Sequence, residues 1–409
     1  MTRLWRTHAF EEPVLIRGEG CRVWDDRGRS YLDLLAGCWC TVLGHGHPRL
    51  TEAVRQQAAT LTHTGPPFAS DALHIGLSKL AEVLPAGLDR VVLLNTGSEA
   101  VELALKMARA ARDADTIVVV ARSYYGATTY AYALSEAGRG LGWLPAVGSV
   151  ERVAAPDCRN CPAGTTWPCD GFPCLDSLRE LTGKPDRPIA AVLFEPVLAN
   201  AGVIVPPIGY GRCLHALAGE CGALFIAEEV TTGLGRTGRW FGCDHDAVVP
   251  DILVLGKALG GGLPVAAVAT TAEAEERCAG RLTHVQSHQN DPLSGCITAT
   301  VIAVLQEEDL VARAARSGTH FLDGLKRVQA SHDVIADVRG RGLMLGVELR
   351  RERADLGVRA ARRLLEAGFI VNYQPHNASF RLFPPYIITN GEIDAFLDEF
   401  DSALSGAAE

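Results

Sequence analysis

Short, uninterrupted apolar runs recur through the middle of the chain, separated by stretches with helical periodicity. Because consecutive residues in each run are apolar, a strand built from it would be buried on both faces, as in a parallel sheet covered by helices. Between the first two runs, Val101, Ala104, Leu105 and Ala108 have the spacing of an amphipathic helix. We therefore predict an α/β protein with a mostly parallel sheet. The predicted strands are residues 90–95, 116–121, 189–195, 223–230, 251–257 and 265–270.

The pattern also predicts two domains. Alternating strands and helices extend from about residue 55 to 305, and we expect this part to be the large domain. From about residue 306 the pattern becomes a helix, then strands, then a final helix over residues 392–404, which is typical of a smaller α+β domain. We expect residues 1–54 to join residues 306–409 in that domain. A segment rich in cysteine and proline, about residues 151–180, interrupts the large domain as an insert.

Composition excludes several classes of protein. The net charge of −9, from 39 basic and 48 acidic residues, argues against a nucleic-acid surface held by phosphate contacts. No apolar run approaches the roughly 18–20 residues that a membrane span needs. The first residues also lack the apolar segment of a secretory signal. We therefore expect a cytoplasmic protein, with no membrane partner, whose 12 cysteines are mostly reduced thiols.

The first candidate for chemistry lies at the start of the predicted helix, in residues 95–100. Thr96 and Glu99 have the spacing of a capping box, which marks a helix N-terminus directly after a strand. Such a terminus offers free backbone N–H groups and a positive dipole end to a phosphate. Gly97 permits close approach of the backbone, and Ser98 adds a hydroxyl. An ordinary capped helix would have the same sequence.

Two charged residues end other predicted strands. Glu228 lies at the end of a strongly apolar run, where α/β sheets place their active sites, and a buried carboxylate there requires a partner. Lys257 also ends an apolar run, before a glycine-rich loop; burial there would favour the neutral, nucleophilic amine. Residues 233–238 match G-x-G-x-x-G, but no helix opens inside the match, so we disfavour a nicotinamide or flavin site.

Together these three sites match the requirements of pyridoxal 5'-phosphate (PLP). The phosphate would bind at Gly97 and Ser98, and the pyridine nitrogen would pair with Glu228. The aldehyde would form a Schiff base with Lys257, so that the cofactor acts as an electron sink. Each of these three features has a structural explanation of its own. Because a phosphate site, a carboxylate and an amine occur together at the strand ends of one sheet, we favour a PLP site.

A series of ordered motifs resembles the class III aminotransferases of the fold-type I PLP-dependent superfamily over nearly the whole chain. Within that class the dialkylglycine decarboxylase branch is the most similar, especially in residues 85–90 and 337–346. The resemblance implies a large domain with a seven-stranded, mostly parallel sheet, a smaller α+β domain, and a homodimer with shared active sites. The motifs are residues 43–48, 95–100, 195–197, 229–230 with 233–238, 250–252 with 257–264, 337–342 and 381–385.

The resemblance also implies roles for single residues. Lys257 would move the proton between the substrate and the cofactor. Tyr124 would stack on the pyridine ring, and Val230 would cover its opposite face. Ser287 would reach the phosphate of the neighbouring subunit. Arg381 would bind the substrate carboxylate through a two-pronged hydrogen bond.

A further substrate-binding role is implied for Glu195, which would pair with Arg381 when no carboxylate is bound. The sequence also departs from the family at three places. Glu228 replaces an aspartate, and Tyr125 replaces a histidine beside the stacking aromatic. Cys38 replaces a glutamine that holds the leaving carboxylate in the decarboxylases, and a thiol is a weak donor. We expect Trp39 to line the same pocket.

The insert holds four cysteines with the spacing C-x2-C-x7-C-x4-C. The first pair has the spacing of a structural zinc site, while the second pair is slightly wide. A possible structural zinc is one interpretation. A surface loop whose thiols pack as small apolar groups is the other. The cysteines are Cys158, Cys161, Cys169 and Cys174.

We therefore predict a PLP-dependent aminotransferase that moves an amino group from an amino acid to a 2-oxo acid through Lys257. A PLP-dependent amino-acid racemase or epimerase is the first alternative, because it needs the same residues. A decarboxylating transaminase is the next, and Cys38 argues against it. The sequence does not distinguish an α-amine from an ω-amine substrate.

Overall fold

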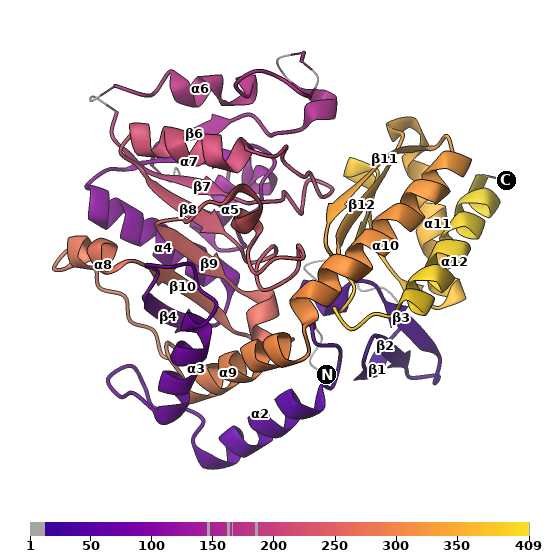
Figure 1. The fold of residues 1–409 in the computed structure, drawn as a ribbon, viewed down its shortest axis with the longest axis horizontal. Coiled ribbons are helices and arrows are strands. Elements are labelled where there is room, and N and C mark those ends of the chain that lie inside the picture. Colours follow the sequence, from indigo (N-terminus) through magenta and orange to yellow (C-terminus); the bar gives the residue numbers. More distant parts are fainter. Residues whose placement is uncertain (1–12, 145–147, 162–163, 166, 185–186, 409) are drawn as a thin grey trace.

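The computed structural model describes residues 13–144, 148–161, 164–165, 167–184 and 187–408 (Figure 1). The strands of this part of the chain form three sheets. The largest has seven strands in the order β4-β10-β9-β8-β7-β5-β6. Its strands are β4 (Arg90–Leu94), β5 (Thr116–Val120), β6 (Val150–Val153), β7 (Ile189–Phe194), β8 (Leu224–Glu228), β9 (Ile252–Leu255) and β10 (Ala266–Thr270).

The large sheet is mostly parallel, as predicted. Strands β6, β5, β7, β8 and β9 pair in parallel, and only β10 runs in the opposite direction, between β4 and β9. All six residues of β7 are buried. Three of them join one core cluster (Ile189, Val192 and Phe194) and three join another (Ala190, Ala191 and Leu193). Helix α4 (Gly97–Arg112) covers one face, and α7 (Tyr210–Glu220) packs on the other.

Two four-stranded sheets contain the remaining strands. One is antiparallel, in the order β11-β12-β15-β14, and the other has the order β1-β2-β3-β13. In the second sheet β13 pairs in parallel with β3, so it joins the two ends of the chain. The strands are β1 (Leu15–Glu19), β2 (Arg22–Asp25), β3 (Ser30–Asp33), β11 (Ile335–Arg341), β12 (Met344–Leu349), β13 (Phe369–Ile370), β14 (Asn372–Gln374) and β15 (Ser379–Leu382).

Helices complete these layers. One that the sequence pattern did not predict, α11 (Ala354–Ala367), lies between β12 and β13 and buries only a narrow stripe of residues. The others are α1 (Ala36–Trp39), α2 (Pro48–Thr60), α3 (Asp71–Ala81), α5 (Thr129–Leu134), α6 (Asp176–Arg179), α8 (Ala272–Cys278), α9 (Pro292–Glu307), α10 (Leu310–Ser331) and α12 (Asn390–Ala408). Within the described ranges, no helix is both long and apolar enough to cross a membrane.

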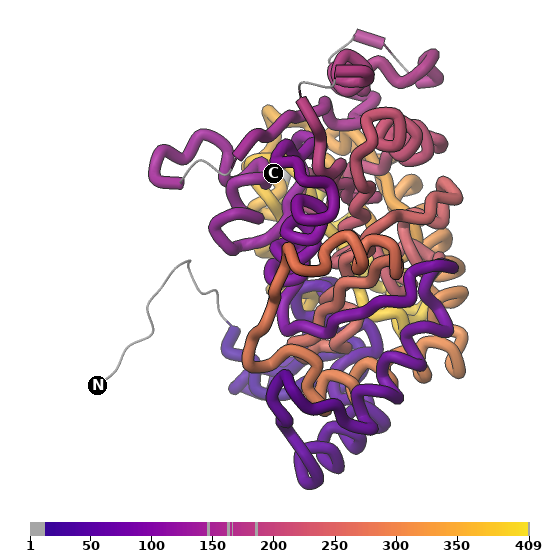
Figure 2. Tube along the Cα trace, turned by 90° about the vertical axis from the view of Figure 1, so that its left-hand side faces the viewer, coloured from indigo at the N-terminus to yellow at the C-terminus, as the bar shows by residue number. Residues whose placement is uncertain are grey.

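The two ends of the predicted large domain fall in helices. Residues 54 and 55 lie inside α2, which packs against α9, and residue 305 lies near the end of α9. The division into two domains stays a prediction. The predicted insert begins too early, because residues 151–153 belong to the edge strand β6. Figures 1 and 2 place α6 and the segments around it at the outer margin of the molecule.

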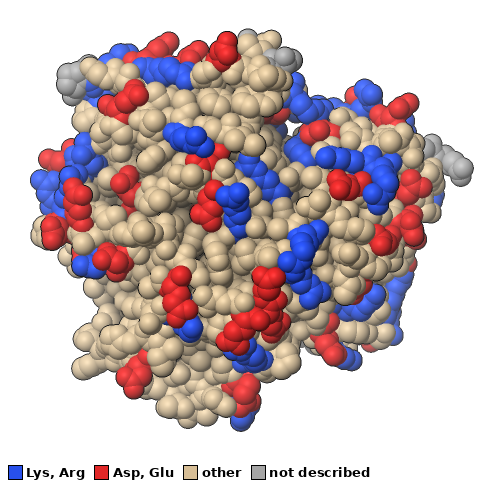
Figure 3. Space-filling view, viewed as in Figure 1, with Lys and Arg blue, Asp and Glu red and all other residues tan. Residues whose placement is uncertain are grey.

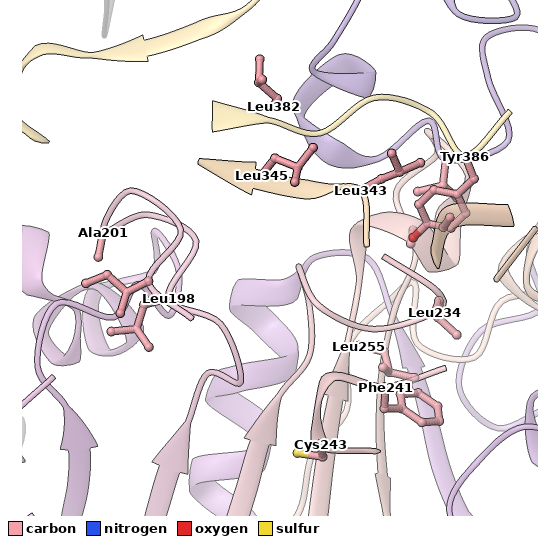
Figure 4. Close-up of a cluster of buried hydrophobic side chains, with 14 of the residues drawn as sticks. Leu198, Ala201, Leu234, Phe241, Cys243, Leu255, Leu343, Leu345, Leu382 and Tyr386 are labelled. Carbon is pink, nitrogen blue, oxygen red and sulfur yellow. The ribbon is translucent and has the colours of Figure 1, made fainter. Parts of the chain in front are cut away.

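One core cluster extends from the large sheet to the antiparallel sheet of β12 and β15. Figure 4 shows Leu234 and Phe241 above the strands of the large sheet, facing Leu343, Leu345 and Tyr386. Because one cluster contains residues from both sheets, the large sheet and the antiparallel sheet share a continuous apolar contact. Charged side chains of both signs are interspersed on the face that Figure 3 shows.

Candidate active site

A cavity of about 480 Å³ brings together most of the predicted site residues. It is lined by Cys38, Trp39, Gly97, Ser98, Tyr124, Tyr125, Glu195, Glu228, Val230, Lys257 and Arg381. Sequence reasoning missed several other lining residues, which are Leu35, Gly37, Gly126, Ala199, Asn200, Thr231 and Asn372.

The N-terminus of α4 forms one wall of the cavity. Thr96 Oγ1 accepts a hydrogen bond from the Glu99 backbone N–H (3.2 Å), and Glu99 Oε2 accepts one from the Thr96 N–H (3.0 Å), so the predicted capping box is present. A Cβ at Gly97 would lie 2.8 Å from Val230 Cγ1. The Ser98 hydroxyl accepts a hydrogen bond from the Ala127 N–H at 2.9 Å, which ties the helix start to the neighbouring loop.

Glu228 ends strand β8 and is buried in the cavity wall. Its Oε1 accepts a hydrogen bond from the Val230 N–H at 3.3 Å. Burial raises the pKa of Glu228 to about 7, although nearby Lys257 lowers it in part. The next residue, Glu229, is buried away from the cavity and accepts hydrogen bonds from the N–H groups of residues 242 and 243, both at 2.8 Å. One carboxylate therefore faces the cavity, and the other holds the chain after the strand.

Lys257 follows β9 in a left-handed conformation, with φ of 41°. Its Nζ donates a hydrogen bond to Thr231 Oγ1 at 2.9 Å and lies 5.2 Å from the centroid of the Trp39 ring. Thr231 thus positions the amine in the cavity. The position of Thr231, three residues after Glu228, was the one signal that could have identified this residue from sequence.

Glu195, at the end of β7, is the second buried carboxylate of the cavity. It accepts hydrogen bonds from the backbone N–H groups of Ala199 (3.1 Å) and Tyr124 (3.5 Å). Burial raises the pKa of Glu195 well above its usual value, and the neighbouring charge of Glu228 raises it further. Tyr125 lies beside it, with its hydroxyl donating to the Leu193 carbonyl at 3.2 Å.

Arg381, on β15, has amide partners rather than the predicted carboxylate. Its Nε donates to Asn372 Oδ1 (2.8 Å), and its Nη1 donates to Asn200 Oδ1 (3.0 Å). The predicted pair with Glu195 is not formed in this structure, where Asn200 accepts a hydrogen bond from the guanidinium and Glu195 accepts hydrogen bonds from backbone N–H groups. A role for Glu195 at Arg381 stays a prediction. Burial lowers the pKa of Arg381 to about 10.

Cys38 and Trp39 reach the cavity from a strained turn. Residues Ala36, Gly37, Cys38 and Trp39 all have positive φ, at 47°, 65°, 106° and 71°. Only glycine adopts this region at little cost. Asp33 holds the turn, since its carboxylate accepts hydrogen bonds from the N–H groups of residues 35 (2.8 Å) and 37 (2.9 Å). Trp39 stacks on Phe383 with a centroid distance of 4.6 Å, and the Arg381 guanidinium lies 4.7 Å from its centroid.

Ser287 lies outside the cavity of its own chain, in an exposed turn. In the same turn, His288 Nδ1 lies 2.6 Å from Asp291 Oδ2, and His63 Nδ1 lies 2.6 Å from Asp291 Oδ1. The loops that carry His63 and Ser287 are therefore neighbours. A role for Ser287 at the phosphate of another subunit stays a prediction.

The structure does not support the predicted zinc site. Burial, and secondarily the neighbouring cysteines, raise the pKa of the Cys158 thiol, and burial raises that of Cys174 to about 11. In the described part of the chain, a set of three potential metal ligands within 4.8 Å of one another occurs around Asp291, with His63 and His288. Cys158, Cys161, Cys169 and Cys174 form no such set.

Solved structures share this fold. The ornithine aminotransferase from Toxoplasma gondii, in a structure with partial occupancy of PLP at the active site, is 31% identical with a TM-score of 0.87. The match covers 98% of this chain and 92% of that chain. The architecture is therefore that of a PLP-dependent transaminase.

Sequence relatives narrow this class to a family. The acetylornithine aminotransferase of Mycobacterium leprae is 35% identical over 96% of this chain and 91% of its own length. The leucine/methionine racemase of Thermococcus litoralis is 31% identical over 97% of this chain and 91% of its own length. The family model described as aminotransferase class-III matches residues 7–404. The chain belongs to the class-III aminotransferase family, as the motifs predicted.

Proposed function

We propose that this aminotransferase moves the amino group of an amino acid to a 2-oxo acid with PLP bound in the cavity. The observation that carries the proposal is the convergence of four groups there: the amine of Lys257, the carboxylate of Glu228, the N-terminus of α4 and the guanidinium of Arg381. These groups come from four separate parts of the chain, and each matches a different part of the cofactor or substrate.

The lining residues fit PLP. Glu228 is a buried carboxylate in need of a cationic or N–H partner, which a protonated pyridine nitrogen supplies. Gly97 and Gly126 leave no Cβ atoms at the start of α4, where a phosphate would meet backbone N–H groups and the Ser98 hydroxyl. Lys257 provides the amine for covalent attachment. When bound, PLP supplies an aldehyde carbon and a ring that stabilises negative charge on the substrate.

The residues of the chain then have distinct tasks. With PLP bound, Lys257 would hold the cofactor through its amine and would move a proton at the substrate Cα. Thr231 orients the Lys257 amine through its hydroxyl. Arg381 orients the substrate by binding its carboxylate. Tyr124 and Val230 line the cavity where we propose that they flank the ring.

An amino-donor screen with pyruvate and 2-oxoglutarate tests the proposal. The absorbance change that accompanies conversion of bound PLP to pyridoxamine phosphate should appear with at least one amino acid, and a 2-oxo acid should reverse it. Absence of that change with every natural amino acid would contradict the proposed function.

Lys257→Ala gives the first specific prediction. Because this change removes both the attachment point and the proton carrier, turnover should fall by at least about 1,000-fold. Lys326→Ala, at an exposed lysine of α10, is the matched control and should retain activity. Borohydride treatment should link the cofactor to the peptide that contains residue 257 in the wild type. Full activity of Lys257→Ala would refute the role of this residue.

A racemase is the second candidate function, and the Thermococcus litoralis relative favours it. Both activities begin with loss of the Cα proton to Lys257. Product analysis separates them: a 2-oxo acid formed from the amino donor indicates transfer, and loss of optical rotation without a 2-oxo acid indicates racemisation.

We also propose that the protein forms a homodimer with shared active sites and that it is located in the cytoplasm. The neighbouring loops around His63 and Ser287 carry exposed apolar side chains, with Phe68 at 69% and Val285 at 67% exposure. Exposed apolar side chains near a predicted shared-site residue fit a contact with a second copy of the chain. The 12 cysteines fit a reducing compartment.

A further inference from the structure

The guanidinium of Arg381 is held by neutral groups. Arg381 is only 6% exposed. Its Nε and Nη1 donate to the side-chain oxygens of Asn372 and Asn200, at 2.8 Å and 3.0 Å. In the amide orientation that satisfies both of its polar atoms, Gln374 accepts a third bond from Nη2 at 3.1 Å. Over the ranges that the structure describes, no carboxylate forms an ion pair with Arg381.

The charge of the buried carboxylate of Glu195 acts on Arg381, but Glu195 does not compete with a substrate carboxylate for the guanidinium. Its two oxygens already accept hydrogen bonds from the N–H groups of Ala199 and Tyr124. Burial and the charge of Glu228 also favour the neutral form of Glu195. Arg381 therefore carries a buried positive charge that its surroundings orient but do not neutralise. A buried charge without a counter-charge is costly, so the site favours an anion.

The position of Arg381 places that anion near the reacting carbon. The Arg381 guanidinium and the Lys257 amine both lie close to the Trp39 ring, at 4.7 Å and 5.2 Å from its centroid. A carboxylate on Arg381 thus belongs to the part of the substrate that reacts at Lys257. A substrate with only hydrogen or carbon at that position would leave the guanidinium unpaired.

We propose that Asn200 keeps Arg381 permanently open to a carboxylate and so restricts the enzyme to substrates whose reacting carbon carries one. The expected substrates are α-amino acids and 2-oxo acids, in both halves of the reaction. This inference rests on the proposed function. A carboxylate at position 200 would occupy the guanidinium when the substrate brings none, and the neutral amide of Asn200 does not do so. Asn200 is a positioning residue, because it acts through Arg381.

The test uses the holoenzyme with Asn200→Asp, and with Asn200→Gln as the neutral control. Two donors are compared, the best α-amino acid from the screen and β-alanine, whose carboxylate is one carbon further from the amine. The wild type should favour the α-donor by at least about 100-fold in kcat/KM. Asn200→Asp should raise KM for the α-donor at least about tenfold with a smaller change in kcat, while Asn200→Gln, which introduces no charge, should raise KM less than Asn200→Asp does.

A binding measurement provides a readout that does not depend on turnover. Propanoate carries the carboxylate without the amine, and calorimetry should show it binding at least about tenfold more weakly to Asn200→Asp than to the wild type. Comparable use of β-alanine and the α-donor by the wild type would overturn the inference. Unchanged KM and propanoate affinity in Asn200→Asp would also overturn it. A wild type without activity on any donor would instead refute the proposed function.

Discussion

Two buried carboxylates, Glu195 and Glu228, end adjacent strands of the large sheet and share one cavity. Burial raises the pKa of both, and the charge of Glu228 raises that of Glu195. Without the cofactor, each carboxyl group therefore holds its proton more tightly in the folded protein than in the unfolded chain. A protonated pyridine nitrogen beside Glu228 would favour the charged carboxylate and reverse this effect.

The stability of the cofactor-free protein should therefore depend on pH. With a pKa raised from 4.5 to about 7, Glu228 contributes stability that is fully present below pH 4.5 and is lost as the pH rises through 7. Urea denaturation between pH 5 and 8 should show this decline. Glu228→Gln should reduce the slope without removing it, because Glu195 acts in the same direction. An identical slope in both proteins would contradict the raised pKa.

Two charged site residues, Lys257 and Glu228, were predictable because each one ends an apolar run. Arg381 was predicted only from the family resemblance, and all three residues line the cavity. Asn200 and Thr231 are neutral residues in connecting segments, where polar side chains are common, so only the place of Thr231 three residues after Glu228 set one of them apart. The partner of Arg381 depends on how the chain after β7 packs against β15, which local patterns do not determine.

At the scale of elements, the start of α4 depends on two glycines that keep its first turn open. Gly126 has φ of 143°, and a Cβ there would lie 2.6 Å from Ser98 Oγ. The Ser98 hydroxyl is already held by the Ala127 N–H. A side chain at position 126 would therefore displace the hydroxyl that we propose to bind phosphate.

Gly126→Ala should weaken PLP binding by about tenfold or more, since strain of this kind costs about 1–3 kcal/mol. Gly142→Ala is the matched control, because a Cβ at that glycine would meet no atom within 4 Å. Titration of each cofactor-free protein with PLP, followed by absorbance, measures the difference. Equal affinities in the two variants would show that the start of α4 does not hold the phosphate.

The strands of the large sheet were predictable because they are buried on both faces, as all six residues of β7 illustrate. Edge strand β6 was assigned to the insert because its polar residues interrupt the apolar pattern. Helix α11 was missed because it buries only four residues among many charged ones. The reversed direction of β10 follows from the short connection after β9, whose path the sequence does not show.

At the scale of the whole molecule, Arg236 connects the large sheet to the antiparallel sheet. It is 1% exposed, and its Nη1 donates to the backbone carbonyls of Leu343 (2.9 Å) and Pro384 (2.7 Å). Its guanidinium also lies 4.7 Å from the centroid of the Tyr386 ring, beside the core cluster of Figure 4. One side chain thus satisfies carbonyls from two segments that are distant in sequence.

Arg236→Ala should lower the free energy of unfolding by about 3 kcal/mol or more, because it leaves a cavity and two buried carbonyls without donors. Arg239→Ala removes an exposed arginine from the same loop and should cost less than about 1 kcal/mol. Denaturant titration of both variants, followed by circular dichroism, compares them. Equal losses would show that the buried contacts of Arg236 do not hold the two sheets together.

The pairing of β13 with β3 has a consequence for synthesis on the ribosome. Strand β3 precedes every strand of the large sheet, yet its neighbour at residues 369–370 is made only after all of them. The strands of the large sheet, by contrast, are all available after residue 270. A nascent chain can therefore assemble the large-sheet side of the cavity before Arg381 is made, so a chain that stops before residue 381 lacks the guanidinium that we propose to bind a carboxylate.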